Sequence, residues 1–261
     1  MGYIPAMNSS LSGKWVLITG ASSGFGAAAA RAFAAQGCNL LLGARRVDRL
    51  EALAGEIRQP GAGHLLDVSS TASVEKFVDW ARAKTARVDV LINNAGGAQG
   101  ADPVASGRDA DWETMFQTNV LGLLRVTRAV LPLMMNNPGS SILSIGSVAG
   151  HTAYEGGAVY CAAKAGERKI TQALRLELSG TGIRVGSLDP GLAETEFSMV
   201  RFKGDEERAR KVYQGIHPLT AEDIAEALVW MAGRPPHVNI DEMIIKPTDQ
   251  AAIHKVFRRE K

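Results

Sequence analysis

The chain has 261 residues, of which 46% are hydrophobic, enough for a substantial core in one large or two small domains. The net charge of +2 gives no electrostatic reason to expect binding to nucleic acid or to a membrane surface. No apolar run approaches the roughly 20 residues that cross a bilayer, and the first ten residues lack a secretory signal pattern. With only two cysteines, Cys38 and Cys161, there is no disulfide framework, so we expect a soluble, cytoplasmic protein.

Short apolar runs alternate with helical patterns along the chain. We expect strands at 15–19, 39–43, 64–68, 88–93, 141–145, 183–188 and 242–245, and helices at 27–36, 47–57, 74–84, 111–135, 157–179 and 223–231. This alternation predicts βαβ units in an α/β fold: one doubly wound Rossmann domain, with helices on both faces of a parallel sheet. Residues 1–12 are expected to be a flexible tail and 13–261 the single domain, in which 192–217 form a mobile lid.

A glycine-rich turn joins the first expected strand to the first expected helix. Glycines allow a tight turn and a close approach to a pyrophosphate, and the N-terminus of a helix adds N–H groups and positive potential. A plain strand–helix turn is the alternative. We predict a dinucleotide site formed by Gly20, Ser22, Ser23, Gly24, Phe25 and Gly26.

The second expected strand ends in two arginines, where an NAD site has an acidic residue for the ribose hydroxyls. Because the planar fork of arginine pairs with phosphate, we predict NADP(H), with Arg45 the first candidate for the 2′-phosphate and Arg46 the second. Two solvated arginines at a helix start are the alternative. Further cofactor candidates follow the next strands at the same sheet edge: Asp67 and Val68 toward adenine, and Asn94, Ala95 and Gly96 toward its ribose.

Tyr160 and Lys164 lie one helical turn apart, and Ser147 lies thirteen residues before Tyr160. A phenol titrates near ~10 in water, and a lysine on the same helix face favours its ionised form. A serine hydroxyl at the same point would complete a proton-transfer site for an alcohol or a ketone. Taken singly, the three residues are more often a core ring, a surface charge and a strand-end cap.

Cys161 and His151, near this group, are residue types that take part in other kinds of catalysis. The side chain of Cys161 should point about 100° away from that of Tyr160 around the helix, so we expect it to pack. His151 is expected either to face a substrate or to be a solvated loop residue. No His, Cys and Glu cluster has metal-ligand spacing, so no metal is expected.

With these motifs in this order, the chain resembles the short-chain dehydrogenase/reductase family over about residues 12–250. The resemblance implies hydride transfer between NADP(H) and a secondary alcohol or ketone, with Tyr160 moving the proton, Ser147 binding the substrate oxygen and Lys164 binding the nicotinamide ribose. It also implies that Asn119 belongs to the catalytic set through a water that links to Lys164. On the family pattern, Pro190, Gly191 and Thr195 flank the nicotinamide.

Several later segments resemble one branch, the NADP-dependent 3-hydroxy acid (serine) dehydrogenases. These segments are 154–157, 194–198, 200–205, 218–224 and 237–240. The resemblance implies a homotetramer built on the helices near 111–135 and 157–179, and a substrate such as serine or 3-hydroxypropanoate. Residues 243–250 depart from the branch, because a lysine and an aspartate stand in a tail that is usually more apolar or amide-rich.

The substrate pocket is less defined. Arg201 and Lys203 lie on the expected lid, where one of them would hold a substrate carboxylate unless both are solvated, and Tyr154 is expected to line the opposite side. Two other functions stay open. One is a carbonyl reductase of an apolar ketone, in which Arg201 has no role. The other is an NADP(H)-binding sensor or scaffold without turnover, against which the set Ser147, Tyr160 and Lys164 argues.

Overall fold

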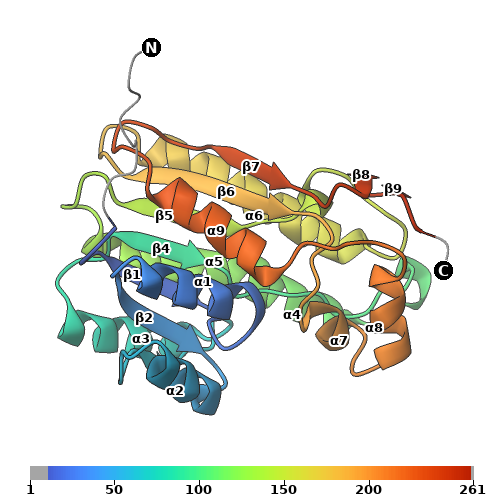
Figure 1. The fold of residues 1–261 in the computed structure, drawn as a ribbon, viewed down its shortest axis with the longest axis horizontal. Helices are drawn as coiled ribbons and strands as arrows, with labels where there is room; N and C mark the ends of the chain where they lie inside the picture. The colour runs from blue at the N-terminus through green and yellow to red at the C-terminus, as the bar shows by residue number, and fades with distance from the viewer. Residues whose placement is uncertain (1–10, 260–261) are drawn as a thin grey trace.

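The computed structural model describes residues 11–259. Seven parallel strands form one sheet in the order β3-β2-β1-β4-β5-β6-β7 (Figure 1). They are β1 (Trp15–Thr19), β2 (Asn39–Ala44), β3 (Gly63–Leu65), β4 (Val90–Asn93), β5 (Ser141–Ile145), β6 (Arg184–Pro190) and β7 (Glu242–Ile245). The strand order reverses between β1 and β4, so the fold is the expected doubly wound one, and a crevice opens at the carboxyl ends of these two strands.

Helices cover both faces of this sheet. Helices α1, α2 and α9 pack on one face, and α3, α5 and α6 pack on the other (Figure 1). Side chains alternate along each strand, so Val16 and Ile18 enter the first layer while Leu17 enters the second. The helices are α1 (Gly24–Ala35), α2 (Val47–Glu56), α3 (Thr71–Lys84), α4 (Asp109–Met115), α5 (Gly122–Val130), α6 (Ala158–Glu177), α7 (Phe197–Arg201), α8 (Glu206–Tyr213) and α9 (Ala221–Ala232).

The long helix expected at 111–135 is wrong as a single α-helix. A π-helical turn, Phe116–Leu121, separates α4 from α5, and a 3-10 turn, Leu131–Leu133, follows α5. The widened turn carries the buried Asn119, whose side-chain amide donates to the carbonyl of Met115 at 2.7 Å. A wider turn keeps the apolar face continuous in sequence, which explains why periodicity does not reveal it.

Three further parts differ from expectation. The lid region contains α7 and α8, and the chain ends in a short antiparallel hairpin, β8 (Gln250–Ala252) with β9 (Lys255–Val256). Leu11, which we expected in the tail, is buried in the core beneath α1 and α9, and its carbonyl accepts a bond from Cys38 Sγ. The rest of the expected tail, residues 1–10, lies outside the described residues.

Two negative observations hold for residues 11–259. No helix there is long and apolar enough to cross a membrane. Nor does any group of three or more His, Cys, Asp or Glu side chains within that span have the arrangement of a metal site.

A buried arginine ties the last helix to the sheet. Arg184 on β6 is 8% exposed. Its guanidinium donates to the carbonyls of Met231 at 3.2 Å and Ala232 at 2.7 Å, in the last turn of α9. The Met231 carbonyl also accepts from the backbone N–H of Arg234 at 3.4 Å, so Arg184 adds to the hydrogen bonds of the helix end.

Replacing Arg184 by methionine keeps an apolar stem but removes these donors. We expect the free energy of unfolding to fall by about 2–4 kcal/mol, because buried carbonyls lose their partner. Urea denaturation followed by circular dichroism measures this. As a control, R82M removes an exposed arginine that pairs with Asp79 on the same helix, and should cost less than about 0.5 kcal/mol. Equal free energies of unfolding for R184M and R82M would contradict the stabilising role of the Arg184 hydrogen bonds.

Candidate active site

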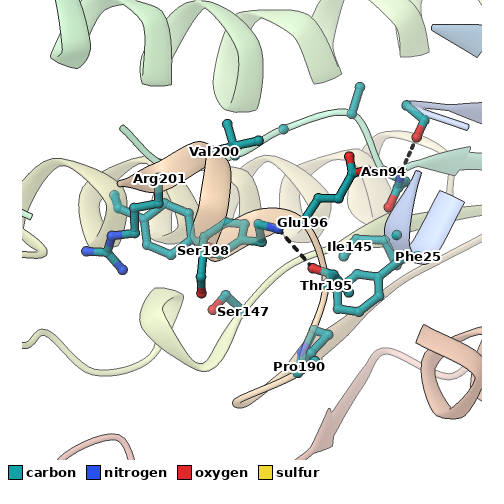
Figure 2. Close-up of a pocket in the computed structure, with 18 of the residues that line it drawn as sticks. Phe25, Asn94, Ile145, Ser147, Pro190, Thr195, Glu196, Ser198, Val200 and Arg201 are labelled. Carbon is teal, nitrogen blue, oxygen red and sulfur yellow. Dashed lines mark hydrogen bonds between the residues drawn. The ribbon is translucent and has the colours of Figure 1, made fainter. Parts of the chain in front are cut away.

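A pocket of about 720 Å³ lies at the carboxyl ends of the central strands. Every predicted site residue lines it except Gly26, Asn119 and Lys203, the alternative to Arg201. In Figure 2, Phe25 and Asn94 lie on the right of the drawn residues and Arg201 on the left, with Ser147 between them. The topology therefore brings the predicted cofactor turn, the predicted catalytic group and part of the predicted lid to one cavity.

The glycine-rich turn has the geometry of a phosphate cradle. Gly20 and Gly24 have φ values of +67° and +50°, which favour glycine. A side chain at Gly26 would come within 2.5 Å of the carbonyl oxygen of Gly20, so this position supports the turn from behind without reaching the pocket. Ser23, at the N-terminus of α1, makes no side-chain cap, and the first N–H groups of the helix therefore remain available for an anion.

The turn is tied to the loop that follows β4. Thr19 Oγ1 accepts hydrogen bonds from the backbone N–H groups of Asn94 and Ala95, at 3.0 and 2.9 Å. In return, the Asn94 side-chain amide donates to the carbonyl of Thr19 at 2.8 Å. Thr19 was not among the predicted site residues, although it stands in the turn motif.

The two arginines after β2 have different surroundings. Arg46 donates to Ser22 Oγ at 3.2 Å and to Ser23 Oγ at 2.6 Å, so its guanidinium lies against the phosphate turn. It also pairs with Glu196, at 3.0 Å. Arg45 is exposed and lies nearer Asp67, where hydrogen bonding from Ser69 and the charge of Arg45 lower the pKa of the Asp67 carboxyl.

Glu196 had not been foreseen as a site residue. It precedes α7 and reaches both Arg46 and Arg49, with a distance of 2.7 Å to the latter. These ion pairs connect the predicted lid to α2 across the mouth of the pocket. The partners are separated by 150 and 147 positions in the chain, which leaves no local signal in the sequence.

Tyr160 and Lys164 lie on the face of α6 that is turned toward β5. Tyr160 is buried, and its ring lies 5.7 Å from that of Phe197 on the lid. Lys164 Nζ donates to the carbonyl of Ile145 at 2.8 Å, at the end of β5. Burial lowers the pKa of Lys164, but the nearby carboxylate of Glu167 and the Tyr160 side chain outweigh it, so the pKa is raised and the ammonium stays charged.

Ser147 follows β5 and caps the short turn Val148–Gly150. Its Oγ accepts from the N–H of Ala149 at 3.1 Å. The hydroxyl proton is not used by that bond, and it can donate to an oxygen in the pocket. The structural and the functional interpretation of Ser147 are therefore compatible.

Asn119 lies behind the pocket wall. Its side-chain amide donates to the carbonyls of Met115 and Gly97, and its oxygen accepts from the N–H of Gly97 at 3.0 Å. A side chain at Gly96 would come within 2.5 Å of that oxygen and 3.8 Å of Lys164 Nζ. The Asn119 side chain thus clamps the loop after β4 close to Lys164, and the water link that the family resemblance implies stays a prediction.

The two cationic side chains of the lid have different surroundings. Arg201 lines the pocket, donates to Tyr154 Oη at 2.9 Å, and its guanidinium carbon lies 5.8 Å from the centre of the Tyr160 ring. Lys203 instead pairs with Asp111 at 2.8 Å and is not among the lining residues. The substrate-binding hypothesis therefore narrows to Arg201, with Tyr154 beside it.

His151 has neither of the surroundings that we considered. Its Nε2 lies 2.5 Å from the buried Asp189, away from the pocket lining. Another buried acid, Glu167, lies 2.7 Å from Lys164 Nζ. Its position three residues after Lys164 places it on the same helix face, a spacing that is visible in the sequence.

Comparison with known proteins finds relatives that match most of the chain. A family model described as short chain dehydrogenase matches residues 14–206. The chain is 46% identical over 239 residues to sulfoacetaldehyde reductase 2 of Chromohalobacter salexigens (90% of this chain, 95% of that one). It is 45% identical over 237 residues to an NADP-dependent 3-hydroxy acid dehydrogenase of Salmonella typhi (90% and 96%).

Among solved structures, the closed form of a serine dehydrogenase complexed with NADP+ matches with a TM-score of 0.88 and 41% identity. The match covers 94% of this chain and 100% of that one. These identities, and a family match that spans most of the chain, show that the protein belongs to the short-chain dehydrogenase family.

Proposed function

We propose that this protein is an NADP(H)-dependent dehydrogenase of small 3-hydroxy acids, such as serine or 3-hydroxypropanoate. The observation that carries the proposal is the place of Arg201: a cation in the pocket wall, 5.8 Å from the ring of the proposed proton donor, Tyr160. A carboxylate bound there would bring the hydroxyl-bearing carbon of a short acid toward Tyr160 and Ser147. A sulfonate carries the same charge, so a short sulfonate aldehyde is a second candidate, supported by the similarity to sulfoacetaldehyde reductase 2.

The residues present fit NADP(H). The uncapped N-terminus of α1 and the turn at Gly20 and Gly24 suit the pyrophosphate, and Arg46, held by the turn serines, suits the 2′-phosphate with Arg45 beside it. Asp67, Val68, Asn94, Ala95 and Gly96 would surround the adenosine, and Pro190, Gly191 and Thr195 the nicotinamide. When bound, the cofactor supplies the hydride donor or acceptor at its nicotinamide ring.

The protein residues then move the proton. In alcohol oxidation, Tyr160 accepts the proton of the substrate hydroxyl as the hydride leaves the carbon, and in reduction it returns that proton to the oxygen. Ser147 donates a hydrogen bond to the same oxygen, where negative charge develops. The ammonium of Lys164, one helical turn from Tyr160, favours the ionised phenol.

Other properties belong to the same proposal. A homotetramer packed on the α4–α6 face is consistent with the exposed apolar side chains of Phe116, Leu121 and Leu124 there. A cytoplasmic location is consistent with two buried, unpaired cysteines. Residues 192–217, which include α7 and α8, would act as the substrate lid of the single domain 13–261.

Tyr160→Phe removes the proposed proton donor and keeps the ring. We expect kcat to fall by about 10²–10⁴-fold, because general acid–base catalysis contributes that much. NADPH binding, measured by fluorescence titration, should stay within about twofold because the packing against Phe197 is kept. A variant with wild-type turnover would remove Tyr160 from the mechanism. Binding without turnover in the wild type, with every acid and ketone tried, would favour the sensor.

Arg201→Gln should raise KM for 3-hydroxy acids by about 10–100-fold, the worth of a charge-assisted hydrogen bond. A small neutral ketone should be reduced as before, since it does not use the guanidinium. The matched control is K203Q, which removes the other lid cation, one that pairs with Asp111 outside the pocket lining. If R201Q left KM for every acid and sulfonate unchanged, the apolar-ketone reductase would be the better assignment.

Cofactor choice tests the arginines after β2. We expect R46A to weaken NADP+ about 10-fold or more and to leave NAD+ nearly unchanged, because only NADP+ carries the 2′-phosphate. R45A measures how much Arg45 contributes to the binding of the 2′-phosphate. Dissociation constants for both cofactors, from isothermal titration, give the ratio. An NADP+ to NAD+ preference that survives in the double variant would show that neither arginine reads the phosphate.

A further inference from the structure

A group of buried ionisable side chains lies behind the proposed catalytic residues, between α6 and the ends of β5 and β6. Lys164 is 6% exposed, Glu167 is 3% exposed and Asp189 is 1% exposed. His151, at the end of the turn after Ser147, closes the group on one side through its contact with Asp189. Charges buried to this degree are kept only where they are paired or serve a function.

Lys164 has two contacts on the side away from the pocket. An N–H of the ammonium donates to the carbonyl of Ile145 at 2.8 Å, and Glu167 Oε2 forms an ion pair with the same ammonium at 2.7 Å. Lys164 also lines the pocket together with Tyr160, so its ammonium keeps an N–H for that side. Glu167 is therefore in direct contact with the lysine that the proposed mechanism needs, although it does not line the pocket itself.

We propose that Glu167 is a positioning residue for catalysis: its carboxylate holds Lys164 Nζ in place and offsets part of the lysine charge, and it thereby sets the pH range in which Tyr160 exchanges a proton with the substrate. This rests on the dehydrogenase function proposed above. Glu167 acts through Lys164 and touches neither substrate nor cofactor.

The position of Glu167 is fixed by its own helix and by β5. Tyr160, Lys164 and Glu167 are four and three residues apart, so they follow one face of α6. Thr171, one turn further, bonds to the carbonyl of Glu167 at 3.0 Å and to Ser144 Oγ of β5 at 3.3 Å. Lys164 and Glu167 share α6, and the bond to Ser144 together with that from Lys164 to Ile145 holds their helix face against β5.

The surroundings of Glu167 make its charge variable. Burial raises the pKa of Glu167 to about 7; the ammonium of Lys164 opposes this rise and Asp189 of β6 adds to it. The other ionisable groups on this side are His151, beside Asp189, and the pair formed by Arg168 of α6 and Glu242 of β7. Glu167 is therefore an acid in direct contact with Lys164 whose pKa, about 7, lies near neutral pH.

The direction in which Glu167 changes the ionisation of the Tyr160 phenol follows from these charges. Below about pH 7 Glu167 is neutral, and the full charge of Lys164 acts on the phenol of Tyr160. Above it, the carboxylate offsets that charge, so the ionised phenol is favoured less than it would be beside an unpaired ammonium. A neutral side chain at this position keeps the phenol under the full lysine charge at every pH.

The test compares Glu167→Gln, Glu167→Asp and the control Glu177→Gln, which neutralises an exposed carboxylate on the same helix. We expect E167Q to move the midpoint of the pH profile for alcohol oxidation by about 0.5–1 pH unit toward acid. E167D keeps the charge and should keep the midpoint, while its shorter reach lowers kcat several-fold with KM little changed. E177Q should behave like the wild type.

A second readout needs no turnover. The oxidised nicotinamide is positive and the reduced one is neutral, so ionisation of Glu167 should favour NADP+ over NADPH. We expect the ratio of the two affinities to rise about two- to threefold through pH 7 in the wild type and to stay flat in E167Q. Fluorescence and calorimetric titrations measure this ratio. They test the role of Glu167 even if the enzyme turns over no substrate. Absence of turnover would count against the proposed function alone.

Three results would overturn the proposal. One is an E167Q enzyme with wild-type midpoint and wild-type affinity ratio. Another is an E167Q enzyme that loses thermal stability and kcat but keeps both pH dependences, which would make Glu167 only a structural residue. If E167Q does not fold, the test depends on E167D and on the wild-type titration. An E167D enzyme with unchanged kcat, or a wild-type ratio of NADP+ to NADPH affinity that does not change with pH, would refute the positioning role of Glu167.

Discussion

The hydrogen bonds between the end of β1 and the loop after β4 join the phosphate turn to the pocket wall beside Lys164. Parallel pairing of Val16 with Val90 sets the register of these strands, and Thr19 Oγ1 then accepts from two N–H groups of the β4 loop. This joins the phosphate turn to Gly96, against which Asn119 packs. Because Asn119 also bonds to Met115, the same chain of contacts reaches α4 and the π-helical turn.

Local patterns were enough to predict most of the fold, and they failed where packing decides. Strands with both faces buried read as apolar runs, so β1, β4 and β5 lie within a few residues of their expected positions. The π-helical turn at Phe116–Leu121 was missed because it alters hydrogen bonding without interrupting the apolar pattern. Helix α8 was missed because it is mostly polar and exposed, and only Ala209 is buried.

In the candidate site, too, some residues could be predicted from the sequence and others could not. Residues at strand ends could be placed together from topology alone, since all carboxyl ends of a parallel sheet meet at one edge. Partners that depend on tertiary contact could not. Arg46 meets Glu196 across 150 positions, and only the structure separates Arg201 in the pocket from Lys203 beside Asp111. Glu167 is the exception, because its spacing from Lys164 was visible in the sequence.

These contacts place Tyr160 between two cations, each with its own counter-charge. Lys164 lies on the same helix and pairs with Glu167, while Arg201 lies over the phenol ring from the lid. If Arg201 binds a substrate carboxylate, as proposed, that anion offsets the second cation in the way that Glu167 offsets the first. The field on the phenol then depends on whether an acid is bound. Acidic substrates would therefore not only be held by Arg201 but would also adjust the proton affinity at the reacting oxygen, which neutral ketones cannot do.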